Sequence, residues 1–329
     1  MKEKNHIYAN IILVLLPIIA ALGALMAGRI FIAPADVFKA LFNDEGVTAL
    51  VRMTVVKIRL PRILLGLLAG AGLSVAGCVF QSLFDNPLAT PDTLGVASGA
   101  SFGAAAALLL GFGMIGVQGA SFAFGLLAVI LTFLAGSGKN KGMSAIVLSG
   151  IMIGSLFSSL VSLIKFVADE ESQLPAITYW LMGSLSGAGF RNLLFGAPAI
   201  IISLIIIFLI RWKLNILPLS EEEAVSTGVN IKRLRAVSMI CATLMTASVI
   251  SMCGQVGWVG LLIPHMCRMM TGNNHKRLIP FSISIGATFM VAVDTIARSA
   301  TASEIPISIL TAIIGAPFFI YLMRRTRLL

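Results

Sequence analysis

Residues 59–103 read RLPRILLGLLAGAGLSVAGCVFQSLFDNPLATPDTLGVASGASFG, and they open with a basic tetrapeptide. The apolar run that follows, residues 63–84, can cross a bilayer, because about 20 helical residues span its ~30 Å core. Four glycines in the run let neighbouring backbones approach closely: Gly66, Gly70, Gly72 and Gly77. The run breaks at Asn86-Pro87 and again at Pro91. Such breaks occur in membranes only inside protein or beside water. The pattern therefore predicts a tightly packed span leading into protein-enclosed irregular backbone, as in a transport path.

The whole chain is apolar. Its 329 residues are 58% hydrophobic and 12% charged, with a mean hydropathy of +0.98. A soluble domain carries about 25% charged residues, so we expect an all-α, polytopic membrane protein with one transmembrane domain over residues 1–329. The net charge of +10 does not indicate nucleic-acid binding, because the basic residues lie in the connections between apolar runs.

Ten apolar runs are long enough to count as predicted spans. They are residues 7–27, 63–84, 94–112, 117–134, 144–167, 193–210, 237–253, 256–270, 279–296 and 306–323. The first run is longer than the apolar region of a cleaved signal peptide, which is the competing interpretation. Basic residues in alternate loops place both termini in the cytoplasm. The spans within 63–167 begin outside and those within 237–323 begin inside, so any repeat between the two groups would be inverted.

The outer connection, residues 29–62, departs from that charge rule. It holds more basic than acidic residues: Arg29, Lys39, Arg52, Lys57, Arg59 and Arg62 against Asp36, Asp44 and Glu45. An acidic protein or an anionic solute that meets the outer face would explain the excess, and contact with solvent or lipid phosphate is the alternative. In the ninth span, Asp294 and Arg298 have the spacing of an intrahelical ion pair.

Residues 219–230 form the largest cytoplasmic connection. Ser220 and Glu223 match a capping box, glutamates suit the first turn of a helix, and Gly228 can end the helix in a left-handed conformation. We expect a short, capped helix outside the bilayer. It either docks a cytoplasmic partner or serves only as soluble structure, and the sequence leaves both interpretations open.

Polar and sulfur-containing residues within the spans give weaker signals. The fifth span carries small and hydroxyl residues that either pack helices or line a wet path: Ser149, Gly150, Gly154, Ser155, Ser158, Ser159 and Ser162. The four cysteines are interpreted as small packing residues. His265 could act as a proton relay or a ligand, but no second histidine or carboxylate stands at metal-ligand spacing, which favours a packing or capping role and no metal site. Residues 136–141 lack the spacing of a phosphate-binding loop, so no nucleotide site is expected in this chain.

Four segments resemble the FecCD family of permeases, which belong to ABC importers of iron–siderophores, haem and cobalamin. They are RLPR at 59–62, NPLATPDTLGVASGAS at 86–101, WVGLLIPHMCR at 258–268 and EIPISILTAIIGAPFF at 304–319. The similarity runs in order through nearly the whole chain. One departure is GNNHKRLIP at 272–280, where the family commonly has Asp in place of Asn274.

The resemblance implies a dimer of ten-helix subunits in the bacterial cytoplasmic membrane, with the path between an identical or paralogous pair. Two ATPase subunits, which carry the ATP and Mg, would bind below, and an extracytoplasmic substrate-binding protein would dock above. The family's docking arginines match Arg59, Arg62 and Arg298. Its coupling helix matches 219–230, with Leu219, Glu221, Glu222, Glu223, Ala224, Gly228 and Asn230 as the candidate residues. Its path or gate corresponds to Met143 and Ser144, followed by Ser149 and Gly150.

The expected function is therefore that of a non-enzymatic permease subunit, with an iron–siderophore as first candidate cargo and haem or cobalamin as alternatives. An ion-coupled secondary transporter is disfavoured, because Arg268, Asp294 and Arg298 lie toward span ends rather than at mid-membrane. An intramembrane hydrolase is disfavoured because GSLSG at 183–187 lacks the G-x-S-x-G spacing. A channel would have no need of a capped docking helix.

Overall fold

A computed structural model describes residues 2–42, 46–137, 143–219, 221–301 and 303–325, and these ranges contain helices and no strands. Each of the ten predicted spans coincides with one helix. They are α1 (Lys2–Met26), α4 (Leu60–Leu83), α5 (Val96–Leu109), α6 (Met114–Gly136), α7 (Met143–Val167), α9 (Phe190–Ile210), α11 (Ile231–Cys253), α12 (Val259–Thr271), α13 (His275–Ser299) and α14 (Ile307–Arg325). The all-α prediction is confirmed.

Among the described residues, six helical stretches are long and apolar enough to cross a membrane: Ala49–Leu83, Met114–Gly136, Met143–Val167, Phe190–Ile210, Ile231–Cys253 and His275–Ser299. Three shorter helical stretches are also apolar: Ile11–Met26, Val96–Leu109 and Ile307–Tyr321. The protein is thus a multi-pass membrane protein. The count of ten spans stays a prediction.

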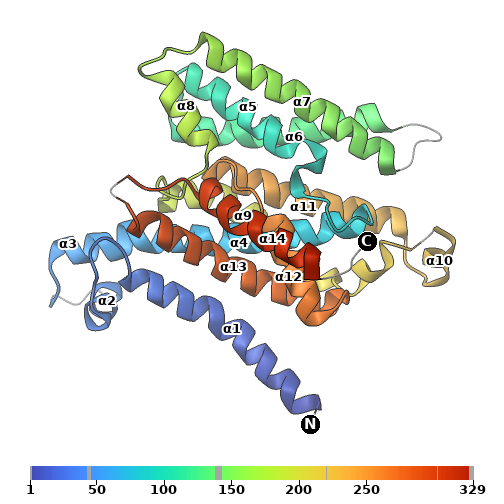
Figure 1. The fold of residues 1–329 in the computed structure, drawn as a ribbon, viewed down its shortest axis with the longest axis horizontal. Coiled ribbons are helices and arrows are strands. Elements are labelled where there is room, and N and C mark those ends of the chain that lie inside the picture. Colours follow the sequence, from blue (N-terminus) through green and yellow to red (C-terminus); the bar gives the residue numbers. More distant parts are fainter. Residues whose placement is uncertain (1, 43–45, 138–142, 220, 302, 326–329) are drawn as a thin grey trace.

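Helix α4 is the centre of the molecule. It packs against α13, α11, α12 and α9 (Figure 1). Of its most apolar 18 residues, 83% are buried. Two of the glycines singled out in the sequence make this packing possible. A Cβ at Gly70 would overlap the carbonyl oxygen of Gly286, and one at Gly77 would overlap that of Gly260. The prediction of close backbone approach is therefore confirmed at both positions.

The helices beyond α4 form a second group. Helices α5, α6 and α7 pack on one another, and the short α8 (Gln173–Leu181) lies against α5 on the upper side of Figure 1. Helix α1 runs along the opposite side and contacts α13. The central α4 and α11 therefore separate α1 from the α5–α7 group.

The break after α4 lies where the prolines predict it. The chain turns at Asp85, whose φ is 45°, then forms a short 3-10 helix, η2 (Pro91–Leu94), and enters α5 at Gly95 with φ 75°. A similar break follows α11, where Gly254 and Trp258 have φ of 71° and 69° before α12 begins. The predicted spans within 63–167 and those within 237–323 thus both begin with a long helix, a break and a shorter helix. This likeness supports an inverted repeat, which stays a prediction.

The segment before α4 is more helical than a simple connection. Besides α2 (Pro34–Leu41), it contains α3 (Ala49–Arg52) and a π-helical segment, η1 (Met53–Arg59), which continue into α4 as one 35-residue stretch. The Leu60 N–H bonds the carbonyl of Val55 in π fashion just before Pro61. This wider turn accommodates the proline, which would otherwise break an α-helix.

Candidate functional site

Arg59 caps the end of a helix to which it does not belong. Its Nη1 donates to the carbonyl oxygens of Leu25 at 2.6 Å and Met26 at 3.0 Å, and its Nη2 donates to Ile30 at 2.5 Å. Leu25 and Met26 are the last two residues of α1, which has no basic residue in its own last turn. A guanidinium at this position satisfies terminal carbonyls and opposes the negative end of the helix dipole.

Arg62 joins three parts of the chain. Its Nε lies 2.9 and 3.0 Å from the two carboxylate oxygens of Asp294 in α13, and its Nη2 lies 2.8 Å from Oδ1. Its Nη1 donates to Glu304, in the connection to α14, at 2.9 Å. This fork geometry is the strongest form of arginine–carboxylate contact. It ties α4 to α13 and to the α13–α14 connection.

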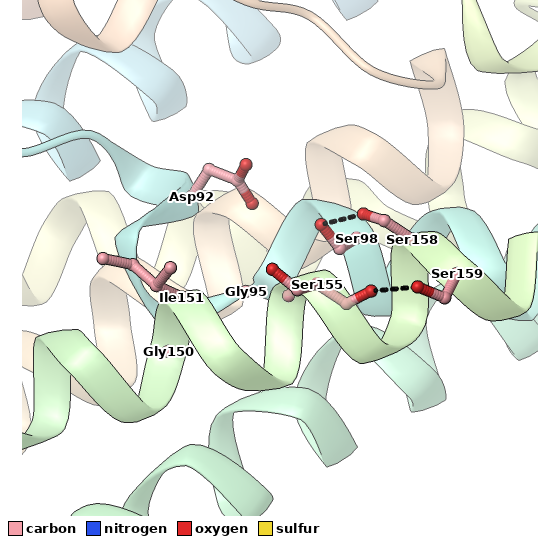
Figure 2. Close-up of a pocket in the computed structure, with 9 residues that line it drawn as sticks. Asp92, Gly95, Ser98, Gly150, Ile151, Ser155, Ser158 and Ser159 are labelled. Atoms are coloured by element: carbon pink, nitrogen blue, oxygen red, sulfur yellow. Dashed lines mark hydrogen bonds between the residues drawn. The ribbon is translucent and has the colours of Figure 1, made fainter.

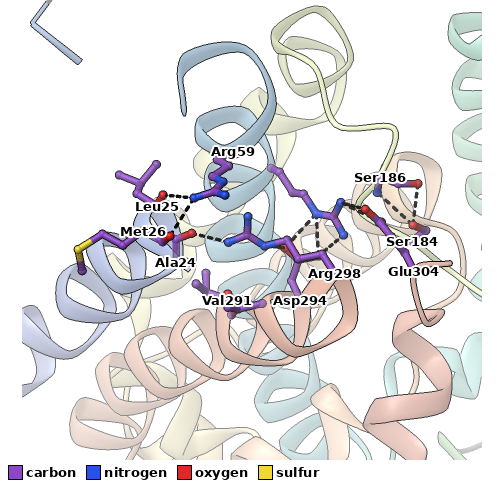
Figure 3. Close-up of polar contacts among 12 residues, drawn as sticks. Ala24, Leu25, Met26, Arg59, Ser184, Ser186, Val291, Asp294, Arg298 and Glu304 are labelled. Carbon is purple, nitrogen blue, oxygen red and sulfur yellow. Dashed lines mark hydrogen bonds and ion pairs between the residues drawn. The ribbon is translucent and has the colours of Figure 1, made fainter. Parts of the chain in front are cut away.

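Arg298 completes what we call the arginine cluster: Arg59, Arg62, Asp294, Arg298 and Glu304. Its Nε lies 3.8 Å from Asp294 Oδ2, which confirms the predicted intrahelical pair. Its Nη2 also donates to the carbonyl of Ala24 at the end of α1 (Figure 3).

The structure thus brings the three predicted docking arginines together, but in contacts within the chain. They are 4%, 5% and 7% exposed, in sequence order. Their role in docking stays a prediction. A partner carboxylate that bound them would have to compete with Asp294, Glu304 and the carbonyls of α1.

A cavity of about 500 Å³ lies between η2, the start of α5 and α7 (Figure 2). Its lining is small, hydroxyl-bearing or acidic apart from one isoleucine: Asp92, Gly95, Ser98, Gly150, Ile151, Gly154, Ser155, Ser158 and Ser159. The close contact of α7 with η2 depends on Gly150, where a Cβ would overlap the carbonyl of Thr93. We call this space the serine cavity.

The sequence located the serine cavity only in part. Of the predicted gate residues, Gly150 lines it, whereas Ser144 and Met143 lie about 9 and 10 Å from Gly150 toward the start of α7, at 1.5 Å per residue. Ser149 is buried. The lining residues Asp92 and Ser98 were missed, because they come from a different part of the chain and no local pattern relates them to α7.

One face of α7 is polar although the helix is mostly exposed. Ser155, Ser158, Ser159 and Ser162 are exposed, and they recur at the three- and four-residue spacing of one helical face. Ser158 Oγ donates to Ser98 Oγ at 3.4 Å, and Ser159 Oγ donates to the Ser155 carbonyl at 3.0 Å (Figure 2). Of the two interpretations that the sequence left open, lining a wet space suits these exposed side chains better than helix packing does.

The predicted coupling segment contains a short helix, α10 (Glu221–Ser226). Gly228 follows with φ 72°, as predicted for the helix end, and Asn230 caps α11 by accepting from the Arg233 N–H at 3.0 Å. Ala224 is fully buried and Leu219 packs partly against the core, whereas Glu223 is exposed. The proposed Ser220 cap and the side chains of Glu221 and Glu222 lie outside the described parts of the structure.

Two polar residues near the start of α13 have structural roles. His275 lies between Ser82 Oγ, 2.6 Å from its Nε2, and Asn215 Oδ1, 3.0 Å from its Nδ1. Asn274, where the sequence departs from the common family pattern, caps α13 by accepting from the Lys276 N–H at 3.0 Å. An asparagine serves this capping purpose as well as an aspartate does.

The remaining candidates are packing residues. All four cysteines are buried and free, as predicted from the sequence: Cys78, Cys241, Cys253 and Cys267. His265 contacts the ring of Phe319 edge-on, with 5.6 Å between ring centroids. This contact fits the packing role expected for that histidine.

Comparison with known proteins gives a consistent result. The model of the FecCD transport family matches residues 13–325. The molybdate import system permease of Haemophilus influenzae is 38% identical over 95% of each chain. A probable iron chelatin transport permease of Helicobacter pylori is 36% identical, over 87% of this chain and 86% of the other. The cobalamin import permease of Halobacterium salinarum is 38% identical, over 85% and 75% respectively.

The fold also matches a solved structure. An inward-facing structure described as a metal-chelate type ABC transporter superimposes with a TM-score of 0.87 at 38% identity, and the match covers 97% of this chain and 99% of the other. The similarity therefore extends over the entire arrangement of helices described above.

Proposed function

The chain belongs to the FecCD transport family, and from this premise we propose that it carries a metal chelate into the bacterial cytoplasm, with an iron–siderophore as the first candidate. It is an ABC transporter permease by membership, with relatives that import molybdate, iron chelate and cobalamin. Because these relatives differ in cargo, the chelate is a proposal. Haem and cobalamin are the alternatives within the same family.

The polar face of α7 carries the proposal. Of the most apolar 18 residues of α7, only 22% are buried within the chain. Four serines lie along one exposed face of this helix. Hydroxyl groups facing lipid would lack partners other than their own helix, so protein or water is expected to cover this face. A second permease subunit, identical or paralogous, would supply protein to cover this face. A water-filled path between the two subunits would supply water to the hydroxyl groups. The serine cavity would then open onto that path.

The two ends of the bundle supply the proposed contacts with partners. The end with the arginine cluster would face outward and receive the substrate-binding protein, and the end with α10 would face the cytoplasm and receive two ATPase subunits. Both termini would then be cytoplasmic. ATP binding would close the ATPases together, move α10, and rock the subunits so that the path opens first outward and then inward. ATP and Mg would be held by the ATPases.

Uptake in liposomes tests the proposal. The chain would be reconstituted with the ATPase and binding protein that co-purify with it, and offered ferric siderophores, haem, cobalamin and molybdate. Uptake of one class that stops without ATP is the expected result. Uptake driven by an ion gradient without the ATPase would overturn the proposal in favour of a secondary transporter. ATP-driven uptake of molybdate alone would overturn the chelate assignment and keep the importer.

A further inference from the structure

Asp92 gives the serine cavity a negative charge. Among the nine described lining residues it is the one ionisable side chain, and the others are glycines, serines and an isoleucine. Its Oδ1 accepts the Ala97 N–H at 3.1 Å. The Asp92 side chain is exposed where the cavity opens to the surface. An exposed aspartate is a carboxylate at pH 8.

Asp92 also occupies N–H groups at the start of α5 that could otherwise attract an anion, because the first N–H groups of a helix have no partner within the helix. It accepts from the Ala97 and Ser98 N–H groups of this first turn. No other charged side chain lines the cavity in the part of the chain that the structure describes. The Asp92 carboxylate is therefore the charge that acts on the cavity from within this described lining.

We propose that the serine cavity selects its contents by charge, favouring cationic or uncharged chelates over free anions. The hydroxyls offer hydrogen bonds to a polar, uncharged surface, and the carboxylate repels an anion of any composition. This inference rests on the proposed function, because a cargo must pass the cavity for the selection to matter. It deepens that function by giving the charge class of the cargo.

The effect of the Asp92 charge should decrease along α7 toward the nearest cation on that helix. Lys165 lies in the last turn of the helix, seven residues from Ser158, or about 10 Å along the axis. Ser162 lies between them, outside the cavity lining. Ser162 lies farther from Asp92 than Ser158 does, so the influence of the Asp92 carboxylate should be weaker at Ser162. This contrast provides an internal control.

Thiol-reactive probes of different charge measure the field without knowledge of the cargo. The full chain carrying Ser158→Cys would be treated at pH 8 with a cationic, an anionic and an uncharged methanethiosulfonate. The four native cysteines are buried, and the parent chain gives their background rate. We expect the cationic reagent to react faster than the anionic one. Adding Asp92→Asn should lower this ratio about fourfold, since a unit charge within ~10 Å changes each reagent's local concentration about twofold in opposite senses.

Two controls decide whether the effect is local. Glu170→Gln removes the same charge from an exposed position beyond the end of α7, and it should leave the ratio at Ser158→Cys unchanged. At Ser162→Cys, Asp92→Asn should have a smaller effect. The rate of the uncharged reagent should be the same with and without Asp92→Asn, which shows that the cavity keeps its shape.

Other results would overturn the inference. A ratio that Asp92→Asn leaves unchanged means that the carboxylate does not govern the cavity, and no reaction with the uncharged reagent means that water does not reach it. These results are independent of transport. ATP-driven uptake with charge-independent labelling would retain the proposed function and reject the inference. Charge-dependent labelling without any uptake would retain the inference about charge and reject the proposed function.

Discussion

At the residue scale, the arginine cluster shows how basic residues can be buried at one end of a membrane protein. Arg59 and Arg298 have carbonyl oxygens of α1 as partners, and Arg62 has two carboxylates. A buried charge is costly unless it is paired and hydrogen-bonded. The cluster therefore joins α1, α4 and α13 where the bundle would otherwise end in unsatisfied groups. The basic excess in residues 29–62 thus includes Arg59 and Arg62, whose partners lie within the chain.

Removing Arg62 should destabilise the protein. In Arg62→Met the buried Asp294 keeps only its longer contact with Arg298, and breaking a buried pair from one side costs about 3 kcal/mol or more. The melting temperature in detergent should fall clearly below that of the parent. Lys57→Met, at an exposed position nearby, should have little effect. Partial recovery in the double variant Arg62→Met/Asp294→Asn would identify the unpaired carboxylate as the cause, and a parental melting temperature for Arg62→Met would contradict the prediction.

Charge reversal in the arginine cluster should weaken binding-protein docking. Arg59→Glu, Arg62→Glu and Arg298→Glu would each repel an acidic partner, and affinity would be measured at low salt, where such contacts are strongest. Lys57→Glu is the matched control for a change in the general field of this face. Unchanged affinity in correctly folded cluster variants would contradict the docking role. An equal loss in Lys57→Glu would assign docking to the exposed basic residues instead.

At the element scale, glycines decide which helices touch. Helix α4 approaches α13 through Gly70 and Gly286, and it approaches the start of α12 through Gly77 and Gly260. Close backbone contact of this kind replaces the hydrophobic driving force that lipid removes. The breaks after α4 and α11 then place short helices beside the long ones. Local backbone geometry thereby sets the shape of the cavity between η2 and α7.

Gly77→Ala should therefore be more harmful than its size suggests. The new Cβ would overlap the Gly260 carbonyl, and overpacking costs about 1–3 kcal/mol, or more where backbone cannot move. The control is Gly119→Ala in α6, where no atom lies within 4 Å of the new Cβ. That change should be neutral or stabilising by up to about 1 kcal/mol. Similar melting temperatures for the two variants would show that α12 can shift away from α4.

The α10 helix should transmit the ATPase cycle. Glu222→Arg reverses a charge at the proposed ATPase contact, and we expect ATP hydrolysis to continue while uptake falls at least severalfold. The measurement is the ratio of cargo transported to ATP hydrolysed in liposomes. Glu170→Arg, at an exposed position remote in sequence, should leave this ratio unchanged. Full coupled uptake in Glu222→Arg would argue against a coupling role for α10.

At the scale of the whole molecule, the proposed function gives the exposed face of α7 a second subunit as its neighbour. The serines on it and the cavity beside it suit a hydrated boundary with a second subunit. A path for a bulky chelate must bind weakly, because tight binding would slow release. Hydroxyls and a single carboxylate among the described lining residues meet that condition better than a dense set of ligands would.

Filling the serine cavity should block transport without unfolding the protein. Ser155→Trp would place an indole in the cavity, and ATP-driven uptake should fall at least tenfold while the melting temperature stays near that of the parent. Leu156→Trp is the matched control, because Leu156 is 52% exposed and does not line the cavity. Normal uptake by Ser155→Trp would remove the cavity from the path. An equal loss in both variants would attribute the effect to the outer surface of α7.

Much of the helical framework follows from local features of the chain. Apolar length predicts each of the ten helices, Pro87 and Pro91 predict the break after α4, and Gly228 predicts the end of the α10 region. These features depend on a few neighbouring residues, so they can be read in order. The sequence did not predict the helices within residues 29–59, because the charged residues there indicated a connection between spans.

The contacts that form the arginine cluster and the serine cavity cannot be predicted from neighbouring residues in the sequence. Arg62 meets Asp294 and Glu304 across 232 and 242 residues, and Asp92 shares a cavity with Ser158 only because η2 packs against α7. Hydropathy and helical period say which segments are buried but not which segments adjoin. That choice depends on the packing of whole helices, where glycine contacts and buried charges from distant segments must be satisfied together. Arg59 is the clearest case: its sequence position suggests an exposed cation, and its place in the fold makes it the cap of α1.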